Sequence, residues 1–198
     1  MAESMSLSDN FPKRLVVGIS GSSGAVYGAR LVEVLGFIDG VETHLVISKG
    51  ARATISYETD YEPDAVMEMA DVVYQQTELG AAIASGTFPT AGMVILPCSI
   101  KTLSHVATSN DASLMVRAAD VTLKERRRLV LGVRETPLHA GHLKLMLAAT
   151  EAGAVILPPV PGFYIKPKTL GDLVDHTITK VLDLFDIDAK LINRWSGL

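Results

Sequence analysis

The sequence predicts a single α/β domain with a doubly wound parallel sheet, of the flavodoxin-like or Rossmann-like kind. Short apolar runs alternate with helix-like segments along the 198 residues. The runs are apolar throughout instead of alternating with polar residues, which is typical of strands covered by helices on both faces. Polar residues follow most of these runs, at the position where open parallel sheets bind ligands.

Composition bounds the class of protein. The chain is 48% hydrophobic and 20% charged, which indicates a large core, and its net charge of −4 disfavours general binding to nucleic acid. The single cysteine, Cys98, and the absence of zinc-ligand spacing indicate a reducing compartment, so we expect a cytoplasmic protein. No apolar run reaches the roughly 18 residues of a membrane span. We expect a flexible tail over residues 1–12 and one domain over 13–198.

The first half of the chain predicts three strands. Residues 14–19 form an apolar run, and a Ser/Gly loop and a helix over 25–36 follow, in which Tyr27, Leu31 and Leu35 recur at helical spacing. Residues 45–47 and 93–96 predict two further strands, each followed by polar residues and a helix-like segment.

The second half continues the alternation. Residues 129–133 predict a strand and 139–152 a helix with Leu143, Met146 and Leu147 on one side. A strand over 154–157, an irregular loop over 158–162 and a helix over 173–185 complete the domain.

Arg134 and Glu135 stand directly after the strand 129–133. A charged group at the edge of an apolar sheet is costly unless it is paired or binds a ligand, and an anion is the simplest partner. The alternative is a solvated turn ended by Pro137.

Two loops after predicted strands have hydroxyl groups at helix starts. The segment Ser20-Gly21-Ser22-Ser23-Gly24-Ala25 can hold an anion or a polar heterocycle at a helix N-terminus, and it matches neither G-x-G-x-x-G, nor a P-loop, nor G-x-S-x-G. The segment 99–102 repeats this pattern, so the two loops together predict a site for flavin mononucleotide (FMN). Ordinary helix capping is the alternative for each loop.

Other polar groups are weaker candidates. Lys124 is a candidate functional residue, whereas Arg126, Arg127 and Arg128 read as a solvated helix end. His139 and His142 lack a third ligand, so we expect no metal site. Cys98 reads as a small packed residue and not as a nucleophile.

Taken in order over residues 13–195, a series of short blocks closely resembles the UbiX/Pad-type flavin prenyltransferases. The blocks are Gly18-Ile19-Ser20-Gly21-Ser22-Ser23-Gly24-Ala25, Ser48-Lys49, Glu58-Thr59-Asp60, Pro97-Cys98-Ser99-Ile100-Lys101-Thr102-Leu103, Arg117-Ala118-Ala119-Asp120, Leu123-Lys124-Glu125-Arg126-Arg127, Arg134-Glu135-Thr136-Pro137 and Pro161-Gly162-Phe163-Tyr164.

This resemblance implies a metal-independent transferase. Such an enzyme joins the dimethylallyl group of dimethylallyl phosphate to N5 and C6 of reduced FMN, and it supplies prenylated FMN to a UbiD-type decarboxylase acting on aromatic acids, as in ubiquinone biosynthesis. The resemblance also implies a homo-oligomer, a dodecamer built from trimers.

The resemblance further implies two sets of binding residues. FMN would be held by Gly21, Ser22, Ser23, Ser48, Ser99, Ile100, Lys101, Thr102 and Arg117. The dimethylallyl phosphate would contact Ser85, Gly86, Lys124, Arg134, Glu135, Tyr164 and Lys180. Trp195 matches a tryptophan that a neighbouring subunit supplies, and a packing anchor for the tail is the alternative.

Catalytic roles follow from the same resemblance and from the chemistry. Breaking an allylic C–O bond leaves negative charge on phosphate, which Lys124, Arg134 and Lys180 would stabilise. Ser23 would face N5, Glu135 would act as acid and base, and Glu58 would accept the proton from C6.

The chain departs from the family pattern at a few positions. Lys180 stands where several members have arginine, Ser22 stands where alanine is common, and Phe88 and residues 61–80 match less well. Two alternatives remain. One is a non-catalytic flavin-binding accessory subunit of a hydroxyaryl decarboxylase, and the other is a flavin-dependent cysteine decarboxylase, whose Asn/Met/Trp substrate segment we do not find.

Overall fold

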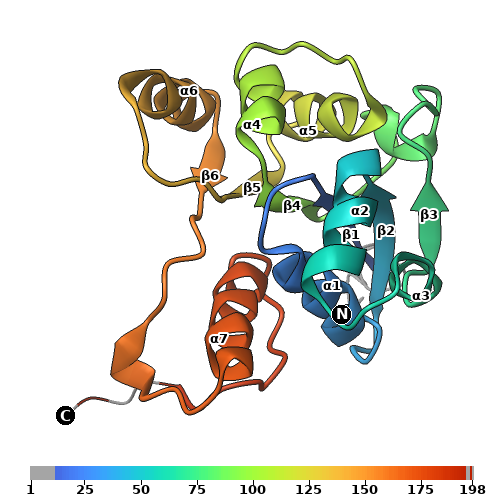
Figure 1. Ribbon diagram of the computed structural model, residues 1–198. Coiled ribbons are helices and arrows are strands. Elements are labelled where there is room, and N and C mark those ends of the chain that lie inside the picture. The colour runs from blue at the N-terminus through green and yellow to red at the C-terminus, as the bar shows by residue number, and fades with distance from the viewer. Residues whose placement is uncertain (1–11, 195–196, 198) are drawn as a thin grey trace, which may run out of the picture.

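A six-stranded parallel sheet in the order β3-β2-β1-β4-β5-β6 forms the centre of the computed structural model, which describes residues 12–194 and 197 (Figure 1). The strands are β1 (Lys13–Ile19), β2 (Val41–Ile47), β3 (Val72–Tyr74), β4 (Gly92–Cys98), β5 (Arg128–Val133) and β6 (Ala154–Ile156). The helices are α1 (Ala25–Leu35), α2 (Lys49–Glu58), α3 (Pro63–Glu68), α4 (Ile100–Ala107), α5 (Leu114–Lys124), α6 (Ala140–Glu151) and α7 (Leu170–Asp183), with 3₁₀ turns η1 (Ala82–Ala84) and η2 (Phe163–Ile165).

The strand order confirms the predicted doubly wound sheet and decides between its two variants. All five strand pairs are parallel, and the order 3-2-1-4-5-6 is that of Rossmann-type domains. The chain moves outward from β1 in one direction to β3 and then in the other from β4 to β6. The crevice beyond the carboxyl ends of β1 and β4 is therefore the expected ligand site.

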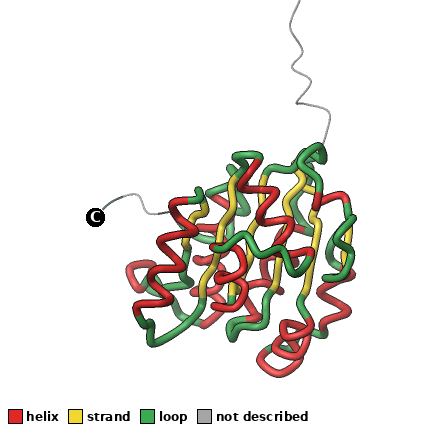
Figure 2. Tube along the Cα trace, turned by 90° about the horizontal axis from the view of Figure 1, so that it is seen from above, coloured by secondary structure: helices red, strands yellow, loops and turns green. Residues whose placement is uncertain are grey.

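Two cores, one on each face of the sheet, explain why its strands are apolar throughout. Leu15, Val17 and Ile19 of β1 pack with α1 and α7, whereas Val16 packs on the opposite side with α4 and α5. In Figure 1, α4, α5 and α6 lie above the sheet and α1 and α7 below it. The view from above shows the strands side by side within this helical cover (Figure 2).

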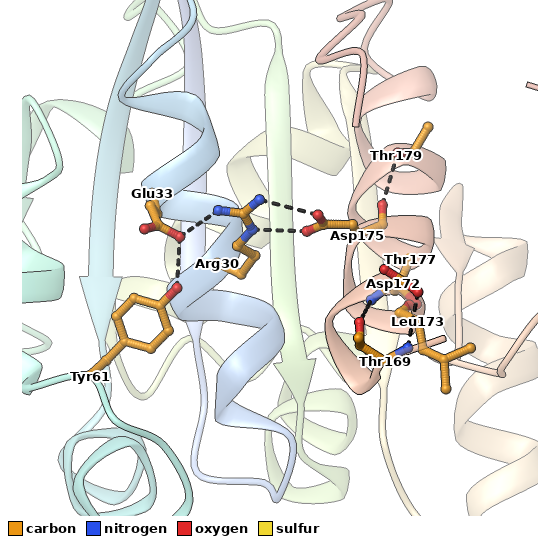
Figure 3. A network of polar contacts seen from close by, with 9 residues as sticks. All are labelled: Arg30, Glu33, Tyr61, Thr169, Asp172, Leu173, Asp175, Thr177 and Thr179. Carbon is orange, nitrogen blue, oxygen red and sulfur yellow. Dashed lines mark hydrogen bonds and ion pairs between the residues drawn. The ribbon is translucent and has the colours of Figure 1, made fainter. Parts of the chain in front are cut away.

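Helix α7 is attached to α1 by a network of polar contacts (Figure 3). The guanidinium of Arg30 donates from Nε and Nη2 to the two carboxylate oxygens of Asp175, at 2.8 and 3.2 Å. Arg30 also donates to Glu33, which accepts a second hydrogen bond from the Tyr61 hydroxyl at 2.7 Å. This bidentate pair fixes the position of α7, which contributes to the candidate site.

Most predicted elements are confirmed, and the differences have local causes. Strand β2 begins at Val41, four residues before the predicted run, because buried Thr43 and His44 continue it despite their polarity. Strand β4 runs on to Cys98 through Pro97. Helix α3 and strand β3 were not predicted, since their segment is short and only partly buried.

Helix α6 exposes its apolar side. Leu143 is 54% exposed and Leu147 is 58% exposed, and Ala149 is the buried residue of the helix. The apolar stripe was correctly read as helical, but much of it lies outside the core of this chain. An exposed patch of this kind marks an interaction surface. Among the described residues, no helix is both long and apolar enough to cross a membrane.

Candidate functional site

A buried serine joins the ends of the two central strands. The Ser20 hydroxyl donates to the carbonyl oxygen of Pro97 at 2.9 Å and accepts from the backbone N–H of Ser99 at 2.7 Å. Because β1 and β4 are parallel neighbours, this contact brings the loop after β1 and the start of α4 together. The two loops that the sequence singled out are therefore adjacent.

Two serine-capped helices begin at this edge of the sheet. The Ser48 side chain accepts from the N–H of Ala51 at 3.0 Å at the start of α2, and the Ser99 side chain accepts from the N–H of Thr102 at 3.2 Å at the start of α4. The capping interpretation is thus confirmed for the loop 99–102, whereas the loop 20–25 supplies no side-chain cap to α1. Each cap satisfies one N–H of the first turn, and the remaining N–H groups are available to a ligand.

A cleft of about 610 Å³ lies between these helix starts. This volume is in the range of small-molecule sites. Five residues of the predicted FMN set line the cleft, namely Gly21, Ser48, Ser99, Lys101 and Thr102. Lys49, which belongs to the Ser48-Lys49 block, also lines it. The others are Gly50, Gln76, His105, Ala112, Ser113, Met115 and Val116, which the sequence analysis did not single out.

Gly21 and Gly50 allow the first loop to lie directly against the start of α2. A Cβ added at Gly21 would stand 3.0 Å from the Cα of Gly50, so a side chain there would press on backbone that cannot move away. Gly21 thus has a packing reason in addition to the ligand approach expected from the sequence.

Gln76 closes the far side of the cleft. Its carbonyl oxygen accepts from the N–H of Leu114 at 2.9 Å, and its side-chain oxygen accepts from the N–H of Met115 at 3.5 Å. Gln76 therefore caps α5 and fixes the end of that helix that lines the cleft. No local pattern could reveal this role, because the partners are far apart in the sequence.

Glu58 lies against the first loop and has a structural function there. Its Oε2 accepts from the N–H groups of Gly24 at 2.7 Å and Ala25 at 3.3 Å. Gly24 has no side chain with which to cap α1, so the carboxylate of Glu58 supplies the cap from the last turn of α2. This places the predicted proton acceptor beside Ser23.

The Arg134-Glu135 pair also reaches the first loop. Ser22 donates from its hydroxyl to the carbonyl oxygen of Arg134 at 2.9 Å, and the N–H of Arg134 donates to the carbonyl of Cys98 at 3.1 Å. The Glu135 carboxylate accepts from the N–H of Thr136 at 2.9 Å. Both charged side chains are exposed, beside the loops that line the cleft.

A second group of predicted substrate residues, from η2 and α7, lies around His176. The hydroxyl of Tyr164 lies 2.9 Å from Nε2 of His176, and the charge of Lys180 acts on that histidine. Tyr27 connects this group to Arg134: burial raises the pKa of Tyr27, which a hydrogen bond with Thr177 and the nearby Arg134 partly offset. Arg134, Tyr164 and Lys180 thus lie on the side of the site that α1 and α7 form.

The remaining residues predicted to bind the donor phosphate lie at the other end of the strands, near the residue where β5 begins. Lys124 ends α5, whose 11 residues extend about 16 Å away from the cleft. Ser85 and Gly86 lie beside Lys124, because a Cβ on Gly86 would stand 2.7 Å from its Nζ. A single chain therefore does not bring Lys124, Ser85 and Gly86 to Arg134 and Glu135.

Arg117 pairs with Asp111 and Asp120, each at 3.6 Å, and it is not among the residues that line the cleft. The interpretation of Arg127 as a solvated helix end was wrong, because its guanidinium donates to the carbonyl oxygens of Gly86 and Phe88. Trp195 lies outside the described residues, as do residues 1–11 of the expected tail.

Cys98 and the histidine pair do not line the cleft. Burial raises the pKa of the Cys98 thiol to about 12, which keeps it protonated and supports its interpretation as a packed residue. The rings of His139 and His142 lie with their centroids 3.6 Å apart and their planes tilted by 33°. Within residues 12–194, no cluster of three or more potential metal ligands is present.

Two buried histidines predict that the fold loses stability in mild acid. Burial lowers the pKa of both His44 and His176, and the charge of Lys180 lowers that of His176 further. The unfolded chain, with ordinary histidines, then takes up protons first, so stability declines as the pH falls below about 6.5. Thermal melts at a series of pH values measure this decline, and it should be shallower in His176→Gln. An equal pH dependence in the two proteins would contradict the prediction.

The comparisons with known proteins agree with this geometry. The family described as Flavoprotein matches residues 3–186. The flavin prenyltransferase UbiX of Thauera aromatica is 59% identical over 184 residues, which cover 93% of this chain and 94% of that protein. The crystal structure of AnUbiX in complex with FMN and dimethylallyl pyrophosphate superposes with a TM-score of 0.92 at 49% identity, covering 94% of this chain and 99% of that one.

A third match is described as a dodecamer. The dodecameric FMN-dependent UbiX-like decarboxylase from Escherichia coli O157:H7 superposes with a TM-score of 0.91 at 43% identity, covering 93% of this chain and 100% of that one. The fold and the cleft thus define an α/β flavoprotein. Within that class, the chain belongs to the UbiX-type flavin prenyltransferase family.

Proposed function

We propose that this protein transfers the dimethylallyl group of dimethylallyl phosphate to reduced FMN and releases inorganic phosphate. The C–O bond of the donor breaks with its electron pair leaving on phosphate, and C1 of the allyl group bonds to N5, which loses its proton. Protonation of the remaining C=C bond then lets the tertiary carbon bond to C6, which loses its proton in turn, so that one proton in total leaves with the phosphate. The observation that carries the proposal is the Arg134-Glu135 pair, which is held by Ser22 against the loop that lines the cleft.

The flavin fits the cleft through groups of this chain. The first turns of α2 and α4 present N–H groups to a phosphate or a polar ring, and Lys101 adds a positive charge. Met115 and Val116 give the cleft an apolar wall. We assign FMN, as a substrate, to this cleft, with Ser23 of the adjoining loop facing N5.

The charged residues around the site have different roles in the reaction. Arg134 and Lys180 stabilise the negative charge that develops on the leaving phosphate, with Lys124 as a third cation. Glu135 exchanges a proton with the phosphate or with N5, and Glu58, which already lies beside Ser23, accepts the proton from C6. These steps need no metal ion.

We further propose that the site is completed between subunits. Lys124, Ser85 and Gly86 stand at the sheet edge opposite Arg134, so a second copy of the chain is the simplest way to bring both sets to one phosphate. The exposed apolar side of α6 supports such an assembly, and a dodecamer is described for the relative from Escherichia coli. Trp195 of a neighbouring subunit would line the same site.

The product would serve a UbiD-type decarboxylase that acts on an aromatic acid, as in ubiquinone biosynthesis, and we place this chemistry in the cytoplasm. The accessory-subunit alternative needs the flavin cleft but not the charged residues around it. Arg134 and Glu135 lie beside the loop that lines the cleft, and Tyr164 and Lys180 lie around His176 on the side of α1 and α7, which favours the transferase.

Anaerobic incubation with reduced FMN and dimethylallyl phosphate tests the proposal, with the released flavin analysed by mass spectrometry. We expect the flavin to gain one five-carbon prenyl unit. Unmodified flavin, with binding confirmed, would overturn the transferase and favour the accessory subunit. A parallel incubation with the diphosphate identifies the donor.

A further inference from the structure

The side chain of Arg127 is directed into the chain and not into solvent. Its Nη2 donates to the carbonyl oxygen of Gly86 at 2.7 Å, and its Nη1 donates to the carbonyl oxygen of Phe88 at 2.8 Å. The two acceptors lie on one turn, which a backbone hydrogen bond from the N–H of Phe88 to the carbonyl of Ser85 closes at 3.2 Å. A planar guanidinium can bridge two such carbonyls at once.

The far end of this turn is anchored in the sheet. The Phe88 ring lies edge-on to the ring of buried His44, with centroids 5.3 Å apart, and the guanidinium carbon of Arg14 stands 4.8 Å from the centre of the Phe88 ring. Arg14 is itself held by Glu42 at 3.3 Å. These contacts hold the Phe88 ring in place, and Arg127 holds the part of the turn before it.

The part of the turn that Arg127 fixes lies against Lys124. A Cβ on Gly86 would stand 2.7 Å from the ammonium of Lys124 and closer still to the Glu125 carboxylate, so the turn lies directly against the ends of these two side chains. The Ser85 hydroxyl lies 2.9 Å from that of Thr87 on the same turn. A hydroxyl, a backbone turn and an ammonium thus lie together.

We propose that Arg127 is a positioning residue for the phosphate of the prenyl donor. It fixes the turn of Ser85 and Gly86 against Lys124, which is paired with Glu125 in this structure, and these three residues then bind the phosphate together as it displaces the Glu125 carboxylate. The inference rests on the proposed function. It assigns to Arg127 an effect on donor binding and none on the flavin, because the cleft lies beyond the other end of α5.

Steady-state kinetics of Arg127→Gln and Arg127→Lys, with donor concentration varied at saturating reduced FMN, test the inference. Losing both charge-assisted hydrogen bonds should raise the KM for dimethylallyl phosphate about tenfold in Arg127→Gln, with little change in kcat. Arg127→Lys keeps the charge and reaches one carbonyl at a time, so its KM should lie between that of Arg127→Gln and that of the unchanged protein. FMN affinity should equal that of the unchanged protein in both variants.

Arg128→Gln is the matched control, since this neighbouring arginine is exposed at the start of β5, and its KM should not change. A wild-type KM in both Arg127 variants would overturn the inference. A parallel loss of FMN affinity and of donor affinity would overturn it as well, because it would show a general structural role. If Arg127→Gln does not fold, Arg127→Lys decides by the same criteria. Absence of product with the unchanged protein would instead reject the proposed function.

Discussion

A Glu135→Gln variant should bind FMN as the unchanged protein does and form prenylated flavin at least about a hundredfold more slowly, the range typical of a lost acid–base group. The amide has nearly the shape of the carboxylate but cannot exchange a proton with the phosphate or with N5. The fold should be unaffected, because the Glu135 side chain is exposed and its hydrogen bond to the N–H of Thr136 can be kept by the amide oxygen.

The measurement combines a flavin titration with the anaerobic turnover assay. Glu151→Gln, which removes an exposed carboxylate at the end of α6, controls for the loss of one negative charge. Wild-type turnover in Glu135→Gln would remove this residue from the mechanism. Loss of FMN binding would assign it to the flavin site instead.

Two variants that are inactive separately should regain activity when their subunits assemble together. Lys124→Gln should lose at least about a hundredfold in turnover because it removes a cation from the developing phosphate charge. If Lys124 and Glu135 of one site come from different chains, random mixing with Glu135→Gln subunits leaves about one quarter of the sites with both residues intact.

Co-expression of the two variants with different affinity tags gives the mixed assembly, which tandem purification isolates. Activity near a quarter of that of the unchanged protein would support a site shared between subunits. A mixed assembly no more active than its parents would contradict the shared site and require both residues to act within one chain. Light scattering on the same samples measures the size of the assembly.

The helix cap, the charges after β5 and the extent of α7 were predictable because they depend on residues that are neighbours in the sequence. Ser99 precedes a helix whose first N–H groups need acceptors, and the structure confirms its cap. The position of Arg134 and Glu135 after β5 follows from an apolar run that ends in charge. Helix α7 was predicted to within three residues at either end because its apolar period is regular.

Other roles were not predictable, since they depend on contacts between distant segments. Glu58 caps α1 from 34 residues along the chain, and Arg127 bonds to carbonyls 39 and 41 residues away. No local pattern distinguishes Arg127 from Arg126 and Arg128. Helix α6 shows the same limit, because an apolar stripe indicates a helix face and not whether this chain or another covers it.

The sequence by itself determined the class of the domain, the strand-end loops and the resemblance to the flavin prenyltransferases, because periodicity, capping and short motifs are properties of neighbouring residues. Only the tertiary structure decided the strand order, the union of the loops at Ser20 and the separation of Lys124 from Arg134. These features depend on which strands pair. They also depend on whether each helix ends near the amino or the carboxyl ends of the strands. Those choices are settled by packing over the whole chain.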